Sequence, residues 1–591
     1  MLQLELYPTI QALQCALING QFTVLDVVNH FLDQAESTRD LNQYIELYSE
    51  EARTQAIALD QKISSKQPLG RLFGMVLSHK DIISYKDHSL SASSNILKGY
   101  TALYSATVLD RVIKEDAIII GRVQCDEFAM GSSNENSCYG PVKNPYDAER
   151  IPGGSSGASA TSVASDTCWA SIGTDTGGSV RQPAAFCGLV GFKPGYGRIS
   201  RHGLIAYASS FDQAGFLTRS VYDAALLLEV TSGIDAYDAS MSDRPVEKYA
   251  ESLNISASGK IAYLDLGHFL DKMDAEIASN YADTISKWKS EGIDLDPISM
   301  DWLDDIIPAY YVLTTAEASS NLSRYDGIRY GHRSPDAHTI EEVYKKTRTE
   351  GFGMEVKRRI LLGTYVLSSG FYDAYYQKAQ QVRRMIKNHL DKIFDQYTAL
   401  ILPVSPVLPW KIGEKIDDPV SVYLADIFTV MANVAGIPGV SIPTGYSKGG
   451  LPIGTQIMAN AWDEKKLLAL AQTLLFPPPQ LKLKSMNVGS VIYKKDLETG
   501  QLTANWNLQA GDNLVGGTGH ATGTPGPDYA GTYAITYYTT ETKKMDTYDL
   551  VIEKSGDYFS LKWFQKDDLK CVGVGLLQDD CLIAGWQTIE E

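Results

Sequence analysis

Histidine and cysteine are both scarce in this sequence, and long apolar runs are missing from it. The 591 residues include nine histidines and seven cysteines, and the cysteines are scattered without CxxC spacing. An odd number of scattered cysteines predicts neither a disulfide framework nor a zinc site. No apolar run approaches the ~18 residues of a membrane span, and the first residues, MLQLELYPTI, do not resemble a signal peptide. We therefore expect a cytoplasmic protein that does not contact membranes.

Positive charge is also in deficit. The chain carries 53 Lys and Arg against 71 Asp and Glu, a formal net charge of -18. Phosphate contacts need clustered Lys and Arg, so this balance argues against direct binding of nucleic acid by this chain. A partner protein can still supply that binding.

Periodic patterns divide most of the chain into helices and strands. Residues 13–37 show apolar residues at helical spacing, broken at NGQF, which predicts two helices. Helical patterns also cover 275–290 and 368–394. Short strand-like runs lie at 74–78, 117–121, 399–404, 439–443 and 454–458. Strands alternating with helices predict one large α/β domain around a mixed sheet, over residues 1–476.

The texture of the sequence changes after three prolines at 477–479, and we expect residues 477–488 to form a linker. Beyond it, segments such as TYAITYY (532–538) and YDLVIEK (548–554) alternate in polarity. This pattern predicts a small antiparallel all-β domain over 489–591.

Within this second domain, GGTGHATGTPG (516–526) is interpreted as glycine-rich turns. The aromatic residues Trp506, Tyr537, Trp563 and Trp586 are more typical of a core than of a ligand platform. No basic patch is present, so we expect the domain to dock a partner protein or stabilise an assembly rather than to bind nucleic acid.

Two runs rich in glycine and hydroxyl side chains stand out, IPGGSSGASA (151–160) and GTDTGGSVRQP (173–183). Neither contains the GK[ST] or strand-flanked GxGxxG of a phosphate cradle. A flexible linker is disfavoured because apolar, strand-like sequence bounds the second run. GGSVR also lacks the second glycine of the GxSxG hydrolase elbow. Local physics leaves a structural and a catalytic role both open.

The second run has the composition of an oxyanion hole. Consecutive backbone N–H groups at Thr176, Gly177 and Gly178, little obstructed by side chains, can converge on one point. Ser179 would stand beside that point as a nucleophile.

A serine hydroxyl needs a base to take its proton, and neither run contains a histidine. His79 follows a strand-like run, but its neighbour Lys80 points to the opposite face of that strand. A lysine there is commonly a snorkelling surface residue or half of an ion pair. Buried next to hydroxyl groups, Lys80 would have a lowered pKa and could act as a neutral base.

Three motifs together resemble the amidase signature family: KD at 80–81, GGSSGASA at 153–160 and GTDTGGSVRQPAAFCGLVGFKP at 173–194. The resemblance implies the fold of that family, a mixed central β-sheet covered by helices. It also implies a Ser, cis-Ser, Lys triad. Ser179 would form the acyl-enzyme, Ser155 would bridge from a cis peptide bond, and Lys80 would be the terminal base.

Four longer blocks, at 126–145, 316–333, 350–383 and 417–443, are similar within that family to the A subunits of tRNA-dependent amidotransferases. This likeness implies hydrolysis of glutamine to glutamate and ammonia. The ammonia would pass to a B subunit that uses ATP and Mg²⁺ to amidate Glu-tRNA(Gln) or Asp-tRNA(Asn), while a small C subunit braces the pair. It implies no cofactor in this chain and contact with tRNA only through the complex.

The same likeness implies a glutamine pocket formed by Arg359 in EVKRRI, Asp426 in YLADIF and Tyr310 in IPAYYV. A guanidinium suits the α-carboxylate of a free amino acid, and a carboxylate suits its α-ammonium. Taken singly, Arg359 is as readily a surface ion-pair partner and Asp426 a helix cap. Tyr310 is one of 34 tyrosines.

The sequence departs from the family pattern next to the triad, at Ser78, His79, Ile82, Ala158 and Gly195. Two other functions stay open. A stand-alone amidase is favoured by the C-terminal extension, which the A subunits normally lack. A binding or scaffold protein built on an inactive amidase domain is disfavoured, because all three triad residues are present.

Overall fold

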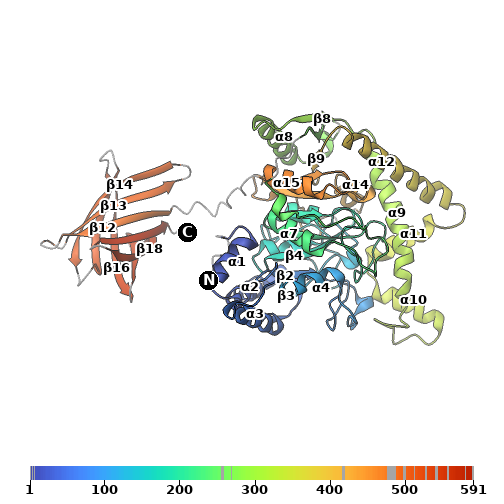
Figure 1. Ribbon diagram of the computed structural model, residues 1–591, viewed down its shortest axis with the longest axis horizontal. Helices are drawn as coiled ribbons and strands as arrows, with labels where there is room; N and C mark the ends of the chain where they lie inside the picture. The colour runs from blue at the N-terminus through green and yellow to red at the C-terminus, as the bar shows by residue number, and fades with distance from the viewer. Residues whose placement is uncertain are drawn as a thin grey trace. The chain divides into compact units, whose positions relative to one another are not determined.

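Eleven strands of the first part of the chain form one sheet, and the last strands form a separate barrel (Figure 1). The computed structural model divides the protein into two units, Met1–Pro478 and Pro479–Glu591, and each is described by itself. The structure describes residues 2, 4, 7–254, 259–267, 269–414, 419–475, 488–496, 499, 501–510, 513–525, 529–539, 544–555, 558–566, 568–578 and 581–588. The linker expected at 477–488 therefore lies outside the described residues, apart from residue 488.

The sheet of the first unit has the strand order β1-β3-β2-β4-β6-β5-β10-β11-β9-β7-β8. Pairs β2–β3, β2–β4, β7–β8 and β7–β9 are parallel and the others antiparallel, so the sheet is mixed, as predicted. The strands are β1 (Tyr44–Leu47), β2 (Val76–Lys80), β3 (Ile118–Val123), β4 (Ala170–Asp175), β5 (Val190–Lys193), β6 (Gln213–Thr218), β7 (Ile261–Leu264), β8 (Leu295–Ile298), β9 (Ala399–Pro403), β10 (Gly439–Tyr446) and β11 (Pro452–Met458).

Helices cover this sheet, and α9, α10, α11 and α12 lie together at one side of the unit (Figure 1). None of the helices within the described ranges is both long and apolar enough to cross a membrane. The helices are α1 (Ile10–Ile18), α2 (Val24–Ser37), α3 (Ser49–Ser64), α4 (Thr107–Lys114), α5 (Gly157–Ala164), α6 (Arg181–Phe186), α7 (Val221–Thr231), α8 (Ala275–Ser290), α9 (Ile306–Asn321), α10 (Ile340–Gly351), α11 (Met354–Val366), α12 (Lys378–Phe394), α13 (Pro419–Leu424), α14 (Val430–Val434) and α15 (Glu464–Leu474).

The helical prediction for 368–394 is wrong in its first part. Helix α11 ends at Val366, the chain turns at Gly370 in the left-handed region (φ 88°), and a π-helical segment, Tyr372–Gln377, precedes α12. Glycine adopts positive φ without the steric cost that other residues meet, so the chain can turn at Gly370 even where the apolar spacing continues.

Burial explains why the central strands could be recognised. Strands β2, β3, β9 and β11, which the sequence predicts, are buried along their whole length. Strands covered on both faces are continuous apolar runs rather than alternating ones. The two helices expected at the start of the chain are confirmed as α1 and α2.

The second unit is a closed antiparallel barrel in which each strand pairs with the next and the last with the first, so the predicted all-β class is confirmed. Trp506 and Trp563 are buried in its core, and Tyr537 packs against them. The side chain of Trp586 lies outside the described part. The strands are β12 (Val488–Lys495), β13 (Leu502–Ala510), β14 (Asn513–Pro525), β15 (Gly531–Thr539), β16 (Lys544–Ser555), β17 (Tyr558–Gln565), β18 (Asp568–Gln578) and β19 (Cys581–Thr588).

The interpretation of residues 516–526 as turns is wrong, because most of this segment lies in strand β14. Its glycines make room for large rings. A Cβ at Gly517 would lie 2.8 Å from the Trp506 ring, and one at Gly519 would lie 2.8 Å from the Tyr537 ring. Glycine within a strand commonly marks such a close approach.

Candidate active site

Lys80 is the last residue of strand β2 and is fully buried. Because β2 runs parallel to β4, with His79 opposite Ile172, the carboxyl ends of both strands meet at one edge of the sheet. The ammonium of Lys80 donates there to Thr174 Oγ1 at 3.0 Å. Burial lowers the pKa of Lys80 to about 8, although nearby carboxyl groups oppose the shift. A base with a pKa close to the working pH is what proton transfer requires.

Two consecutive serines of the first glycine-serine run lie at the Lys80 ammonium. Lys80 Nζ donates to Ser155 Oγ at 2.7 Å and to Ser156 Oγ at 2.9 Å. The peptide bond between Gly154 and Ser155 is cis. The backbone N–H of Ser156 donates to the carbonyl of Ser179 at 3.1 Å, which brings the second run against the first. The structure thus gathers the three predicted triad residues at the end of β2.

The turn that carries Ser179 is organised by a buried ion pair between Asp175 and Arg181. Arg181 donates from Nε and from one terminal nitrogen to the two carboxylate oxygens of Asp175, both at 3.0 Å. Despite burial, the guanidinium of Arg181 holds the pKa of Asp175 well below its usual range. Asp175 is therefore an anion at neutral pH, buried next to the turn.

Of the three predicted oxyanion donors, Gly178 already has a partner, since its N–H donates to Asp175 Oδ1 at 2.8 Å. Its φ of 132° and a clash of any Cβ with Thr429 Oγ1, at 2.3 Å, both require glycine at this position. A Cβ at Gly177 would lie 2.3 Å from the hydroxyl of Tyr310, so that hydroxyl stands directly beside the predicted oxyanion loop.

Arg359 lies on the buried face of α11 with 3% of its surface exposed, so it is not a surface ion-pair partner. Its Nε donates to Glu355 Oε1 at 2.8 Å, one turn earlier on the same helix. One terminal nitrogen donates to the hydroxyl of Tyr207 at 2.8 Å. The guanidinium also faces the rings of Tyr311 and Tyr423, at 5.2 and 5.5 Å from their centroids. These contacts fix the plane of the guanidinium.

Asp426 is buried in the segment between α13 and α14, and its side chain accepts a hydrogen bond from Ser132 Oγ at 2.6 Å rather than capping a helix. Burial raises the pKa of Asp426 to about 7, and the charge of Arg359 opposes this shift. Arg359 pairs with Glu355 and Asp426 accepts from Ser132, so a guanidinium and a carboxyl group with different partners lie in this part of the structure. That arrangement suits a zwitterion.

Several residues of this site carry no local signal in the sequence. Tyr207, Tyr311 and Tyr423 are hidden among 34 tyrosines, and only their convergence on one arginine distinguishes them. Glu355 could have been suspected, because it stands four residues before Arg359, the spacing at which side chains meet on a helix. Ser132 has no such pattern.

The residues that depart from the family pattern are buried around the triad without joining it. His79 contacts Tyr48, with its Nε2 3.4 Å from that hydroxyl, and burial lowers the pKa of His79 to about 3. Ser78 Oγ lies 2.7 Å from Ser171 Oγ and 3.0 Å from Ser162 Oγ. A neutral histidine on the other side of the strand does not compete with Lys80 as the base.

Comparison with known proteins agrees with this geometry. The family model described as Amidase matches residues 26–468. The A subunit of glutamyl-tRNA(Gln) amidotransferase from Chlorobium phaeobacteroides (strain BS1) is 47% identical over 469 residues, covering 79% of this chain and 98% of that protein. The corresponding protein from Prosthecochloris aestuarii is 49% identical over 449 residues, covering 76% of this chain and 94% of that protein.

Solved structures show the same fold. The A subunit of glutamyl-tRNA(Gln) amidotransferase from Thermotoga maritima is similar with a TM-score of 0.64 and 33% identity, over 78% of this chain and 95% of that one. Peptide amidase of Stenotrophomonas maltophilia is similar with a TM-score of 0.67 and 27% identity, over 80% of this chain and 98% of that one. These matches use almost the whole of each relative and leave about a fifth of this chain unmatched.

Proposed function

The chain belongs to the amidase family, and we propose that it is the glutamine-hydrolysing subunit of a glutamyl-tRNA(Gln) amidotransferase. The observation that carries the proposal is a buried guanidinium and a buried carboxyl group with different partners, close to the predicted oxyanion loop. Arg359 and Asp426 are 3% and 6% exposed. Thr429, three residues after Asp426, donates from Oγ1 to the carbonyl of Gly177 at 2.7 Å. A free amino acid held by both charges would direct its side-chain amide toward this loop.

We assign the nucleophile to Ser179 and the proton path to Ser155 and Lys80. The Ser179 hydroxyl attacks the γ-carbonyl carbon of glutamine as its proton moves to Ser155 and the Ser155 proton moves to neutral Lys80. The developing oxyanion is stabilised by the backbone N–H groups of Thr176 and Gly177, while Gly178 shapes the turn.

The acyl-enzyme then forms and ammonia leaves. The tetrahedral species collapses, the carbon–nitrogen bond breaks, and Lys80 returns its proton through Ser155 to the leaving nitrogen. Water attacks the resulting glutamyl ester by the same path and releases glutamate. The 2.7 Å contact between Lys80 Nζ and Ser155 Oγ supports this route.

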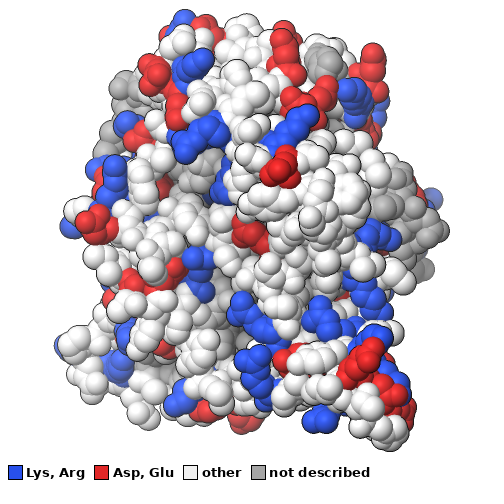
Figure 2. All heavy atoms as spheres, turned by 90° about the vertical axis from the view of Figure 1, so that its right-hand side faces the viewer, with Lys and Arg blue, Asp and Glu red and all other residues white. Residues whose placement is uncertain are grey.

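We assign amidation of the tRNA, with its ATP and Mg²⁺, to a B-type partner subunit, and bracing of the pair to a C-type subunit. The net charge of -18 supports a role in which this chain contacts tRNA only through the complex. Basic and acidic side chains both occur over the whole height of the face formed by α9–α12 (Figure 2). All seven cysteines are free thiols, which fits a reducing cytoplasm.

The stand-alone amidase is the less favoured alternative. Relatives that are 45–49% identical carry the name of the amidotransferase subunit, whereas the peptide amidase is 27% identical. The charged pocket also suits a free amino acid better than an uncharged amide.

Co-purification from the native host followed by a glutaminase assay tests the proposal. We expect B-type and C-type subunits in the complex and release of glutamate from glutamine that increases when mischarged tRNA and ATP are added. A protein that purifies alone and hydrolyses other amides faster than glutamine would instead favour the stand-alone amidase.

A further inference from the structure

Asp212 is a buried carboxylate that directly contacts the predicted oxyanion loop. It precedes strand β6, which pairs with β4 so that Gln213 lies opposite Asp175. This register places Asp212 next to Thr176, whose hydroxyl donates to Asp212 Oδ1 at 2.7 Å. Thr176 is thus held on its side-chain face while its backbone N–H belongs to the predicted oxyanion hole.

The Asp212 carboxylate also holds the segment that contains Tyr207, whose hydroxyl contacts Arg359. The backbone N–H groups of Tyr207 and Ala208 donate to Asp212 Oδ2 at 3.0 and 3.1 Å. The Tyr207 hydroxyl in turn accepts from Arg359 at 2.8 Å. A continuous chain of hydrogen bonds therefore runs from Thr176 through Asp212 and Tyr207 to the guanidinium of Arg359.

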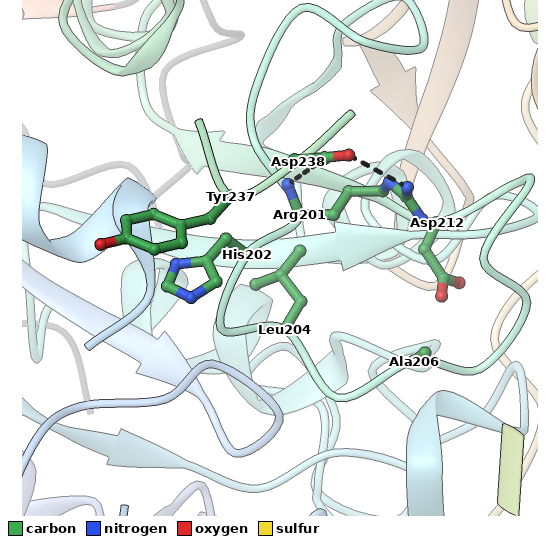
Figure 3. A pocket seen from close by; sticks show the side chains of 7 residues that line it. All are labelled: Arg201, His202, Leu204, Ala206, Asp212, Tyr237 and Asp238. Carbon is green, nitrogen blue, oxygen red and sulfur yellow. Dashed lines mark hydrogen bonds and ion pairs between the residues drawn. The ribbon is translucent and has the colours of Figure 1, made fainter. Parts of the chain in front are cut away.

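Among the described residues, Asp212 accepts from these neutral donors and forms no ion pair. Arg201, which lines the same cavity of about 150 Å³, pairs instead with Asp238 at 3.3 Å. Figure 3 shows Asp212 on the opposite side of this cavity from His202 and Tyr237. Burial raises the pKa of Asp212 to about 6, and the hydroxyl of Thr176 and the N–H of Ala208 oppose that shift.

We propose that Asp212 is a positioning residue that sets the separation between the oxyanion loop and the arginine that receives the α-carboxylate of the substrate. The inference rests on the proposed glutaminase function. Glutamine is anchored at its α-carbon and reacts at its γ-carbonyl, so its amide enters the oxyanion hole only when the two ends of the pocket are in register. An amide without the α-groups has no second anchor and does not need that register.

The test compares glutamine with butyramide, which has a similar amide and neither α-group, using the complex purified from its host. In Asp212→Asn, one of the two carboxylate oxygens becomes an amide NH2 group. The side chain can then no longer accept both from the Thr176 hydroxyl and from the N–H of Tyr207. We expect kcat for glutamine to fall on the order of 100-fold, since misplacement by about 1 Å has such an effect. KM should change by less than about threefold, because Arg359 and Asp426 still bind the substrate.

For butyramide we expect kcat/KM to fall by less than about tenfold, because only the support of Thr176 is lost. The preference for glutamine over butyramide therefore collapses. Thr176→Val cuts the same chain at its other end and should have a smaller effect in the same direction. The double variant should be little worse than Asp212→Asn, because residues that act as one unit are not additive.

Asp223→Asn is the matched control. Asp223 is also buried, and burial likewise raises its pKa to about 6. It accepts from the backbone of Ile10 and from Trp169, away from the triad. We expect this variant to lose stability without any change in substrate preference. Equal losses for glutamine and butyramide in Asp212→Asn would overturn the inference and leave a purely structural role. Wild-type protein that hydrolyses butyramide but not glutamine would contradict the proposed function instead.

Discussion

Lys80 Nζ lies 2.7 Å from Ser155 Oγ, and both side chains are fully buried. The lysine is surrounded by hydroxyl oxygens rather than by a direct carboxylate partner, and burial lowers its pKa to about 8. A substantial fraction of Lys80 is therefore neutral near physiological pH, which a base requires and an ion-paired lysine does not provide.

Replacing Ser179 by alanine should abolish formation of the acyl-enzyme. The hydroxyl beside the oxyanion loop is the group that attacks, and alanine supplies no substitute. Mass spectrometry of the protein after incubation with glutamine is the measurement. Ser159→Ala, at a buried serine in α5 whose hydroxyl makes no hydrogen bond within the described structure, is the control and should remain active. A glutamyl adduct on the Ser179 variant would disprove the assignment.

Activity should depend on the protonation state of Lys80. Only the neutral amine accepts a proton, so kcat should rise about tenfold per pH unit below pH 8 and level off above it. Lys80→Ala should remove this pH dependence together with nearly all activity. Removing one group of a shared proton path costs almost as much as removing all of them. A value of kcat that stays constant between pH 6.5 and about pH 9 would exclude Lys80 as the base.

Arg359→Lys should weaken glutamine binding although the charge is kept. The ammonium of lysine cannot form a two-point contact with a carboxylate while also donating to Glu355 and Tyr207. We expect KM for glutamine to rise roughly 10-fold to 100-fold, the effect of one lost charge-assisted hydrogen bond. Arg348→Lys, at an arginine on α10 that donates to backbone carbonyls, is the control. An unchanged KM would remove Arg359 from the pocket.

The raised pKa of Asp426 predicts that glutamine binding weakens as the pH falls. Burial raises its pKa to about 7, so lowering the pH through 7 protonates it and removes the anion that pairs with the α-ammonium. KM for glutamine should therefore increase as the pH falls below 7, whereas KM for butyramide should not. In Asp426→Asn this acid-side increase should disappear and KM should be high at all pH values. Equal effects on both substrates would indicate a structural role.

The barrel should be dispensable for glutamine hydrolysis. Its core is separate from that of the first unit, and Trp563 is buried in it, 3% exposed. Trp563→Ala should destabilise the barrel by about 3–5 kcal/mol, the usual result of truncating a buried tryptophan. Calorimetry should show a lower-temperature transition for the barrel, while the glutaminase rate of the complex stays unchanged. A parallel loss of glutaminase activity would mean that the barrel contributes to the active site.

Much of this protein is determined by its sequence alone. The glycine-serine runs and the lysine at the end of an apolar run carry the resemblance that predicts the triad, and the structure brings these segments together at the end of β2. Strands β2, β3 and β9 and the helix over 275–290 could be predicted because their apolar residues follow local patterns along the chain.

Only the tertiary structure decided the rest. Arg359, Asp426 and Tyr310 come from different segments, and packing brings them near one another in an arrangement that no spacing along the chain encodes. The closure of the barrel depends on pairing between β12 and β19, which are the first and last strands of the unit along the chain. Asp212 is inconspicuous in the chain, and its role follows from the register of β6 on β4. Contacts between distant residues depend on how buried surfaces fit together, so periodicity, which records only local neighbours, cannot specify them.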